Sequence, residues 1–358
     1  MPIDLRARKL ANLAVKYCVY LKEGETVVIT GGSESEEFIV ELYKAAILQG
    51  CHPVIKMNPQ NISEFFYKYA NKEQIEKFPE QWFDTVKSAQ AYIGIHTEGN
   101  TRELTNSDAE RVMARKKVTS KISDYIVNEK DKIRRVTIAY PCLAHAIESE
   151  MSLTEYENLV YKSCLIDWKK FSKKLDKINK IFEKGKEVYL KGENVNLKFS
   201  IAGKNSVYDD GKENMPGGEV FMAPIRESLN GWVRFEYPAI YSGREVTNIY
   251  LEFFNGRVVK ATADKNEDLL KSVLNTDENA AFVGEFGIGC NPSITKFTKN
   301  LLFDEKIGGT IHLALGMAYK ENGGGNDSAI HWDIVKDMKK ANIILDGKVV
   351  QENGMWKI

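Results

Sequence analysis

The chain has 358 residues, of which 43% are hydrophobic, and its 50 Lys and Arg residues balance 50 Asp and Glu residues to a formal net charge of +0. A domain takes roughly 100–200 residues, so this length predicts two domains, and the composition excludes a wholly disordered chain. The balanced charge gives no overall attraction to nucleic acid or anionic lipid, and no run approaches the roughly 18 apolar residues of a membrane span, so we expect neither partner.

The N-terminal residues and the cysteines bear on the cellular compartment. Residues 1–17 are charged and amphipathic and lack a long apolar core, so the sequence predicts no secretory signal. The cysteines are odd in number, scattered and without a CxxC spacing, which argues against a disulfide framework and a cysteine-type zinc site. We therefore expect reduced thiols and a cytoplasmic location. The cysteines are Cys18, Cys51, Cys142, Cys164 and Cys290.

The first part of the chain alternates short strands with helices. Residues 26–30 form a β-rich run, and residues 35–49 have a helical pattern with Phe38 and Leu42 on one face. Strands separated by helices favour a mostly parallel sheet with helices on both faces. We therefore predict an α/β N-terminal domain with a mostly parallel sheet. The other predicted strands are residues 53–57, 91–96 and 135–140.

A Lys-rich segment over residues 166–186 is expected to form a helix that bridges two domains. Phe171, Leu175 and Ile178 form its apolar stripe, and the lysines form a solvated face. We include this helix in the N-terminal domain, so the predicted boundaries of that domain are residues 1–186.

Strand and hairpin signals dominate residues 187–358. Asn255-Gly256 and Asp346-Gly347 are dipeptides typical of tight hairpin turns, and one helix is expected over residues 266–274. We therefore predict a β-rich α+β C-terminal domain over residues 187–358. The predicted strands are residues 195–201, 251–254, 257–259, 310–315, 343–345 and 348–350.

Five residues of this second domain stand in contexts that solvation explains poorly. His312 lies in a strand-like run that should hold its imidazole rigidly. His331 and Asp333 are spaced two apart, so they project to one face if the segment is extended. Glu219 and Glu285 are flanked by apolar residues and glycines, which let backbone or substrate come close. The five side chains are candidate metal ligands.

The charges of these candidates fit two divalent cations. Two cations bring four positive charges, Glu219, Glu285 and Asp333 bring three negative ones, and a bridging hydroxide brings one, so neutral histidines leave a sum of zero. Oxygen and nitrogen ligands without thiolate suit Zn²⁺, Co²⁺ or Mn²⁺, and Mg²⁺ is a poorer match. Separate structural roles for the five residues are the alternative that this spacing leaves open.

Four motifs that contain these residues occur in order along the chain. They are residues 214–221 (NMPGGEVF), 284–289 (GEFGIG), 309–314 (GTIHLA) and 331–333 (HWD). Together they resemble the M29 family of metallo-aminopeptidases, of the thermophilic aminopeptidase, aminopeptidase T and aminopeptidase S type. The resemblance implies an α/β N-terminal domain and a C-terminal domain that carries two metal ions.

The resemblance also implies an activity and a site. Family members remove N-terminal residues from peptides with a free N-terminus, and they form dimers, so we expect a metal-dependent aminopeptidase that is a homodimer. A tyrosine that follows the first histidine by seven residues in the family corresponds to Tyr319. The implied metal ligands are Glu219, Glu285, His312, His331 and Asp333.

The implied mechanism gives roles to three residues. A water or hydroxide that bridges the metals attacks the scissile carbonyl. Either Glu219 or Glu285 bridges the metals, with Glu219 favoured, and the other glutamate transfers a proton to the leaving amine. Tyr319 steadies the oxyanion or completes the coordination of a metal, with core packing as the alternative.

Two features keep other functions open. The segment between Tyr319 and His331 lacks the longer acidic insert of many bacterial relatives, which affects specificity rather than the ligands. Arg226, Arg234 and Arg244 lie close in sequence to the first candidate ligand, and a basic residue near the metals is typical of phosphoester hydrolysis. The alternatives are a dinuclear metallohydrolase of another amide or of a phosphoester, and a non-catalytic oligomeric binding protein on the same fold.

Overall fold

The computed structural model describes residues 4–358, which divide into two compact units. The first unit contains the described residues up to Leu165 together with Gly211–Pro216, and the second contains Ile166–Asp210 and Gly217–Ile358. Helix α9 (Trp168–Lys184) lies in the second unit, whereas the sequence analysis placed it at the end of the first domain.

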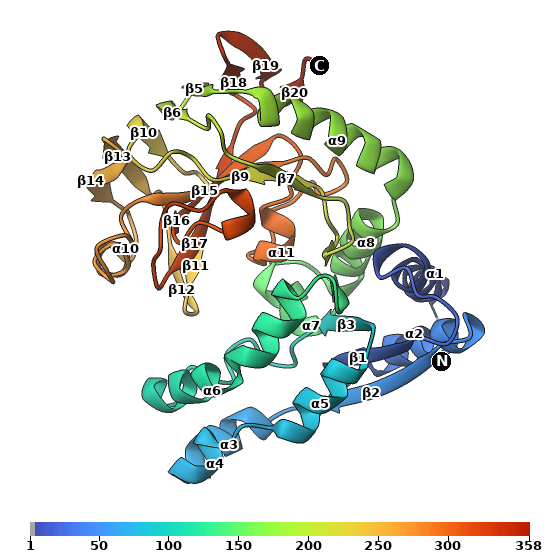
Figure 1. Ribbon diagram of the computed structural model, residues 1–358. Helices are drawn as coiled ribbons and strands as arrows, with labels where there is room; N and C mark the ends of the chain where they lie inside the picture. Colours follow the sequence, from blue (N-terminus) through green and yellow to red (C-terminus); the bar gives the residue numbers. More distant parts are fainter. Residues whose placement is uncertain (1–3) are drawn as a thin grey trace. The chain divides into compact units, whose positions relative to one another are not determined.

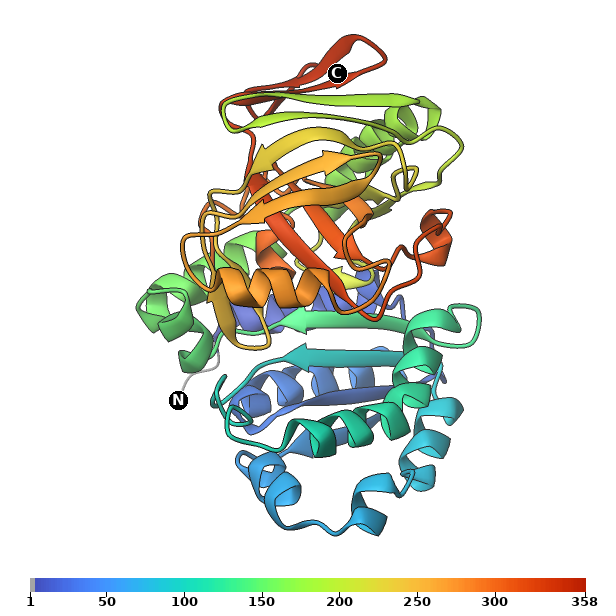
Figure 2. The same ribbon diagram turned by 90° about the vertical axis from the view of Figure 1, so that its left-hand side faces the viewer.

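A five-stranded parallel sheet forms the centre of the first unit. Its strand order is β2-β1-β3-β4-β8, and every neighbouring pair is parallel. Because the crossovers run in both directions from β1, helices cover both faces. Figure 2 shows α2 (Glu36–Leu48) and α6 (Ala109–Asn128) on opposite faces, which confirms the predicted α/β fold. The strands are β1 (Thr26–Gly32), β2 (His52–Asn58), β3 (Ala91–His96), β4 (Arg134–Ala139) and β8 (Asn214–Met215).

The helices of the first unit pack against this sheet through aromatic and aliphatic side chains. Phe38 of α2 stacks on Tyr140 at 4.7 Å between ring centroids. On the other side, Phe83, Val86 and Ile122 form one buried cluster. No helix within residues 4–358 is long and apolar enough to cross a membrane. The other helices are α1 (Leu5–Leu13), α3 (Ile62–Tyr69), α4 (Lys72–Glu76), α5 (Glu80–Ser88), α7 (Leu143–Glu148) and α8 (Leu153–Cys164), with shorter turns at Ala14–Cys18 and Ser33–Ser35.

Two histidines of the first unit stack near the carboxyl end of the parallel sheet. The rings of His96, at the end of β3, and His145, in α7, lie 4.9 Å apart between centroids. His145 is only 6% exposed. Burial, together with the neighbouring His96, lowers the pKa of His145 from 6.5 to about 4. Between about pH 4 and pH 6.5, the His145 imidazole is therefore neutral in the folded protein but protonated in the unfolded chain.

This histidine is expected to make the protein less stable in mild acid. Between its unfolded pKa near 6.5 and its folded pKa near 4, the unfolded chain binds a proton that the folded protein does not, so stability falls as the pH falls through that window. From pH 7 to pH 5 the loss is about 2 kcal/mol in the free energy of unfolding. Urea unfolding of wild type and His145→Leu at both pH values measures it, and an equal pH dependence of the two proteins would contradict it.

Two antiparallel sheets form most of the second unit (Figure 1), as predicted for a β-rich α+β domain. One has eight strands in the order β14-β13-β10-β6-β5-β18-β19-β20, and the other has five in the order β17-β16-β15-β9-β7. The eight-stranded sheet contains β5 (Glu187–Gly192), β6 (Val195–Ser200), β10 (Asn230–Arg234), β13 (Tyr250–Phe254), β14 (Arg257–Thr262), β18 (Ala341–Leu345), β19 (Lys348–Glu352) and β20 (Met355–Trp356).

Both predicted hairpin turns are confirmed. Asn255 and Gly256 have φ values of 47° and 81°, and Asp346 and Gly347 have values of 48° and 80°. Two successive positive φ angles are the geometry of a type I′ turn, which Asn-Gly and Asp-Gly adopt at low cost. A separate hairpin pairs β11 (Ala239–Tyr241) with β12 (Arg244–Val246), and the predicted helix is α10 (Glu267–Leu274).

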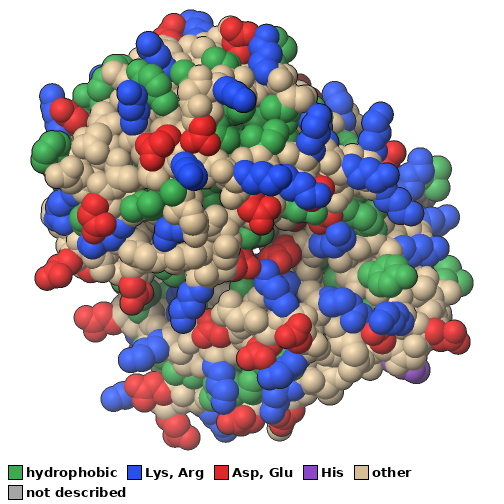
Figure 3. All heavy atoms as spheres, turned by 45° about the horizontal axis from the view of Figure 1, so that its top comes forward, with side chains coloured by type: hydrophobic (Ala, Val, Ile, Leu, Met, Phe, Trp, Pro, Cys, Tyr) green, Lys and Arg blue, Asp and Glu red, His purple; other side chains and the backbone are tan. Residues whose placement is uncertain are grey.

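Helix α9 has the amphipathic structure that its sequence predicts. Phe171, Leu175 and Ile178 are buried, whereas the lysines along the helix are exposed. Over the rest of the face shown in Figure 3, acidic side chains are interspersed with Lys and Arg. The lysines of α9 are therefore solvated charges on a helix that packs through its other face.

The five-stranded antiparallel sheet lies at the core of the second unit. Every residue of β15 (Val283–Gly289) and of β16 (Thr310–Gly316) is buried. A polar side chain on these strands is therefore removed from water and needs a partner. The other strands are β7 (Ser206–Asp209), β9 (Glu219–Met222) and β17 (His331–Asp337).

Candidate metal centre

The five-stranded antiparallel sheet of the second unit brings all five candidate metal ligands onto neighbouring strands. The strands stand in the order β17-β16-β15-β9, so residues far apart in sequence become lateral neighbours. The ligands are Glu219 at the start of β9, Glu285 in β15, His312 in β16, and His331 and Asp333 in β17.

The strand register sets which side chains meet. Glu285 pairs with Ala314, and Ala314 pairs in turn with Asp333. His312 lies two residues before Ala314, so its side chain points to the same face. His331 and Asp333 share a face for the same reason, as the sequence analysis expected.

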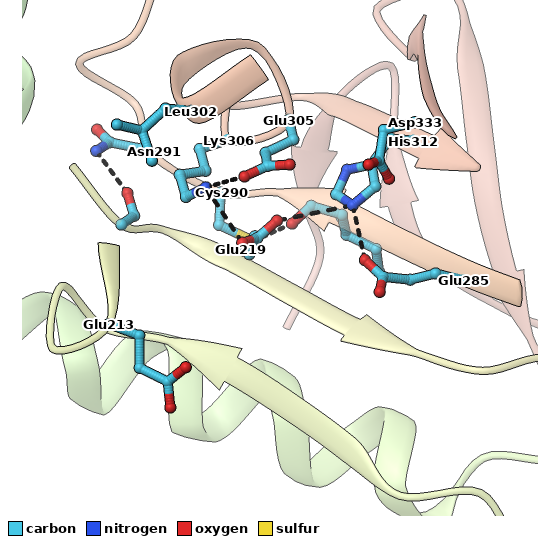
Figure 4. A network of polar contacts seen from close by, with 12 residues as sticks. Glu213, Glu219, Glu285, Cys290, Asn291, Leu302, Glu305, Lys306, His312 and Asp333 are labelled. Atoms are coloured by element: carbon cyan, nitrogen blue, oxygen red, sulfur yellow. Dashed lines mark hydrogen bonds and ion pairs between the residues drawn. The ribbon is translucent and has the colours of Figure 1, made fainter. Parts of the chain in front are cut away.

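The side chains converge on the His312 ring (Figure 4). Its Nε2 lies 3.2 Å from Oε1 of Glu285 and 3.7 Å from Oε2 of Glu219. On the last strand, Nε2 of His331 lies 3.5 Å from Oδ2 of Asp333. Glu285, His312 and Asp333 each offer a ligand atom within 4.8 Å of the others'.

Several polar atoms of this cluster have no partner among the residues that the structure describes. They are Oε2 of Glu285, Nδ1 of His312 and Oδ1 of Asp333, all buried. A buried polar atom without a hydrogen bond costs about 1–3 kcal/mol, and more for a charged group. Oxygen and imidazole donors of this kind, removed from water, match the ligand preference of Zn²⁺, Co²⁺ or Mn²⁺. The donor set therefore fits a divalent cation.

His331 is prepared to act as a ligand through one nitrogen. Its Nδ1 lies 2.9 Å from the carbonyl oxygen of Met317, to which only a protonated Nδ1 can donate. A neutral ring with the proton on Nδ1 leaves the Nε2 lone pair facing Asp333. This outer hydrogen bond is the usual way in which a protein fixes the tautomer and orientation of a metal-binding histidine.

A glycine on the neighbouring strand makes room for the His312 ring. Gly287 of β15 pairs directly with His312 of β16. A methyl group at Gly287 would overlap Nε2, Cε1 and Cδ2 of the imidazole. Gly287, the middle glycine of the GEFGIG motif, is therefore required because the imidazole ring occupies the space that a side chain would need.

The electrostatics of the cluster favour the binding of positive charge. Burial raises the pKa of Glu219 to about 8 and that of Asp333 to about 6. Burial alone would lower the pKa of His312, but the hydrogen bond to Glu285 and the nearby carboxylates raise it to about 10. At neutral pH and without a cation, Glu219 and His312 hold protons that a metal ion would displace, and Asp333 takes up a proton below about pH 6, so metal affinity falls as the pH falls.

Tyr319 stands beside this cluster rather than in the hydrophobic core. Its ring centroid is 4.8 Å from that of His331, and the residue is 39% exposed. Burial of its hydroxyl, followed by the charge of Glu285, raises its pKa. The loop after Tyr319 begins with the 3₁₀ turn η3 (Lys320–Asn322) and is held by Nζ of Lys204, which donates to the carbonyl oxygen of Gly324 at 2.7 Å.

The sequence analysis missed two charged residues of the site, Glu305 and Lys306. They follow the short helix α11 (Leu301–Asp304). Nζ of Lys306 lies 3.3 Å from Oε1 of Glu219 and also pairs with Glu305 (Figure 4). Glu219, Glu305 and His312 form a second group whose ligand atoms all lie within 4.8 Å. In the sequence they are marked only by the charged triplet DEK before IGGTIH, and a charged triplet by itself is typical of an exposed segment.

The three arginines considered for phosphoester chemistry contact residues other than the candidate ligands. Arg226 donates to Asn326 at 3.0 Å. Arg234 lies over the ring of Tyr250, and Arg244 pairs with Asp268. These contacts give no support to the phosphoester alternative.

Comparison with known proteins identifies the family of the chain and relatives that share its fold. The family described as "Thermophilic metalloprotease (M29)" matches residues 4–356. The aminopeptidase AmpS of Bacillus subtilis (strain 168) is 28% identical, with 97% of each chain covered. The structure of wild-type AmpT from Thermus thermophilus superposes with a TM-score of 0.84 at 22% identity, with 99% of each chain covered.

A second solved structure has the same fold and another name. The 2,5-dihydroxypyridine dioxygenase of Pseudomonas putida KT2440 superposes with a TM-score of 0.67 at 12% identity, over 98% of this chain and 96% of that one. The fold alone therefore does not select a chemistry. The family match over almost the whole chain is the stronger finding, and by it the chain belongs to the M29 family of metalloproteases.

Proposed function

We propose that the protein is a metal-dependent aminopeptidase that removes N-terminal residues from peptides. The observation that carries the proposal is the buried group of Glu285, His312 and Asp333 in a member of a metalloprotease family. One ligand atom of each residue lies within 4.8 Å of the others', and each residue has a buried polar atom without a hydrogen-bond partner among residues 4–358. The relatives named aminopeptidase AmpS and aminopeptidase T support a peptide with a free N-terminus as the substrate.

Two metal positions are proposed within this cluster. The first comprises Glu285, His312 and Asp333, with His331 beside it, and the second comprises the carboxylates of Glu219 and Glu305 next to His312. Zn²⁺, Co²⁺ and Mn²⁺ suit these donors, and Mg²⁺ suits them less because imidazole is among them. When bound, the cations supply a nucleophilic water at neutral pH and polarise the scissile carbonyl.

The protein side chains hold and move the proton. Oε1 of Glu219 is engaged by Lys306, whereas Oε2 of Glu285 is buried and has no hydrogen-bond partner within residues 4–358. Glu285 is thus the carboxylate with an oxygen available to take a proton from water and pass it to the leaving amine. This is the pairing of roles that the sequence analysis favoured, with Glu219 as the bridging ligand and Glu285 as the residue that transfers the proton.

Tyr319 is proposed to donate its hydroxyl hydrogen to the developing oxyanion. Its position beside the His331 ring and its raised pKa, which keeps the hydroxyl protonated, support this role. If a Tyr319→Phe variant keeps wild-type turnover, Tyr319 does not donate to the oxyanion.

A cytoplasmic homodimer is also proposed. Strand β2 is at the edge of the parallel sheet, and Val54, Ile55 and Met57 expose 38%, 45% and 43% of their surface on its two faces. An exposed apolar edge strand of this kind offers unpaired backbone groups with which a second chain can pair, which supports a dimer. Light scattering that gives the mass of a single 40.6 kDa chain would contradict the dimer.

Hydrolysis of leucine p-nitroanilide before and after chelation tests the function. EDTA should abolish the activity, because the carboxylates and imidazoles of the cluster are left without a cation, and Co²⁺ or Zn²⁺ should restore it. Titration to saturation should give about two cations per chain. A folded protein that binds no divalent metal and stays inactive after metal addition would contradict the proposal and favour the non-catalytic binding protein.

A further inference from the structure

A lysine ammonium is built into one of the two candidate metal positions. The Lys306 side chain is 0% exposed, and Figure 4 shows its Nζ between the carboxylates of Glu219 and Glu305. These two carboxylates, with His312, make up one candidate group. Part of the negative charge that would attract a metal ion to this position is therefore already neutralised by the protein.

The other candidate position has no such cation. Glu285 and Asp333 form ion pairs only with histidines among the described residues, and each carries a buried oxygen without a partner. The two positions thus both adjoin His312 but differ in charge. A divalent ion entering the first finds free carboxylate oxygens, whereas one entering the second meets the ammonium of Lys306 a few ångströms away.

The surrounding structure holds Lys306 in place. Its backbone N–H donates to the carbonyl oxygen of Phe303 at 3.0 Å, and its carbonyl accepts from the N–H of Asn291 at 3.0 Å. The neighbouring Asp304 is also buried and accepts from the backbone and hydroxyl of Thr298 at 2.7 and 2.9 Å. Because the backbone is anchored and the side chain is enclosed, the ammonium stays beside Glu219 and Glu305.

We propose that Lys306 makes the two metal positions unequal. The chain binds one divalent cation tightly at Glu285, His312 and Asp333, and a second more weakly at the carboxylates of Glu219 and Glu305, because of the fixed ammonium. This inference rests on the proposed metal-dependent function. Lys306 acts through the ligands and does not itself touch substrate, so it is a positioning and charge-setting residue rather than a catalytic one.

Calorimetric titration of the metal-free full-length protein with Zn²⁺ tests the inequality. Wild type should bind two cations in steps whose dissociation constants differ by at least about tenfold. Lys306→Met keeps the length of the side chain and removes its charge, so the second step should tighten by at least about tenfold and approach the first. Lys306→Gln, which can still donate a hydrogen bond to the carboxylates, should shift the second step in the same direction and provides a variant that is easier to fold.

Lys336 provides a matched control. It is also buried, with 1% of its side chain exposed, but it pairs with Glu236 at 2.6 Å and donates to the carbonyl of Asp337, away from the candidate ligands. Lys336→Met should keep the two unequal steps of wild type. Two equal sites in wild type, or a second step that does not tighten in either folded Lys306 variant, would overturn the inference while leaving the metal site itself in place. Failure of wild type to bind any Zn²⁺ would instead overturn the proposed function.

Discussion

Replacement of His312 by alanine is expected to leave a folded protein whose aminopeptidase activity has fallen by at least about a thousandfold, which is more than the 10–100-fold typical of outer-shell partners. The reason is that His312 belongs to both groups of ligands, so its loss affects both proposed metal positions. Its Nε2 also lies 3.2 Å from Glu285, so the carboxylate loses its only hydrogen-bonding neighbour in the described part of the chain. Steady-state hydrolysis of leucine p-nitroanilide, with metal content measured on the same sample, gives the result.

The matched control for this variant is His145→Ala. It also removes a buried imidazole, but from the first unit. It should keep wild-type metal content and hydrolysis at pH 7, although its thermal stability should fall because a cavity remains. Activity of His312→Ala within about tenfold of wild type, on a protein with normal metal content, would show that the cluster is not the catalytic centre.

A single methyl group at Gly287 is expected to weaken metal binding strongly without unfolding the protein. In Gly287→Ala the added carbon overlaps the imidazole of His312, so the ring must leave the position from which it meets Glu285. Overpacking of a buried site costs about 1–3 kcal/mol of stability, which a folded domain can bear. Metal affinity, however, should fall by at least about a hundredfold because a ligand is displaced. Calorimetric titration and thermal unfolding of the variant separate the two effects.

Gly94→Ala provides the comparison within a β-strand. Gly94 lies in β3 of the first unit, and a methyl group there would meet the Tyr92 ring at 3.3 Å and no candidate ligand. It should lose some stability but keep its metal. Normal metal affinity in Gly287→Ala would show that the His312 ring can move without loss of coordination, and would remove the proposed reason for glycine at this position.

Much of the fold could be predicted because local patterns and tertiary structure agree. The type I′ turns at Asn255-Gly256 and Asp346-Gly347 follow from the left-handed conformations that these residues accept. The stripe of α9 follows from the spacing of Phe171 and Leu175. The unit to which α9 belongs was not predictable in this way, because an amphipathic helix shows that it packs but not against which partner.

All five candidate ligands could be named from the sequence, but the contacts between them could be predicted only within one strand and not across strands. His331 and Asp333 are on one face because strand side chains alternate, which the spacing of two already indicates. The pairing of His312 with Gly287 depends on register, which no single segment encodes. Lys306 remained hidden for a further reason: a lysine beside two acidic residues is typical of a surface, and only the tertiary structure shows that it is enclosed.

The construction of the candidate metal centre from four adjacent strands of one buried sheet also bears on how the protein matures. In small zinc domains the metal drives folding, because without it there is too little core to hold the ligands together. Here β15 and β16 are buried along their whole length by the protein itself, so we expect the sheet that carries the candidate ligands to fold without a cation. Newly made chains can therefore accumulate as folded apoprotein, and the supply of metal in the cell would then set how much of the enzyme is active at a given time.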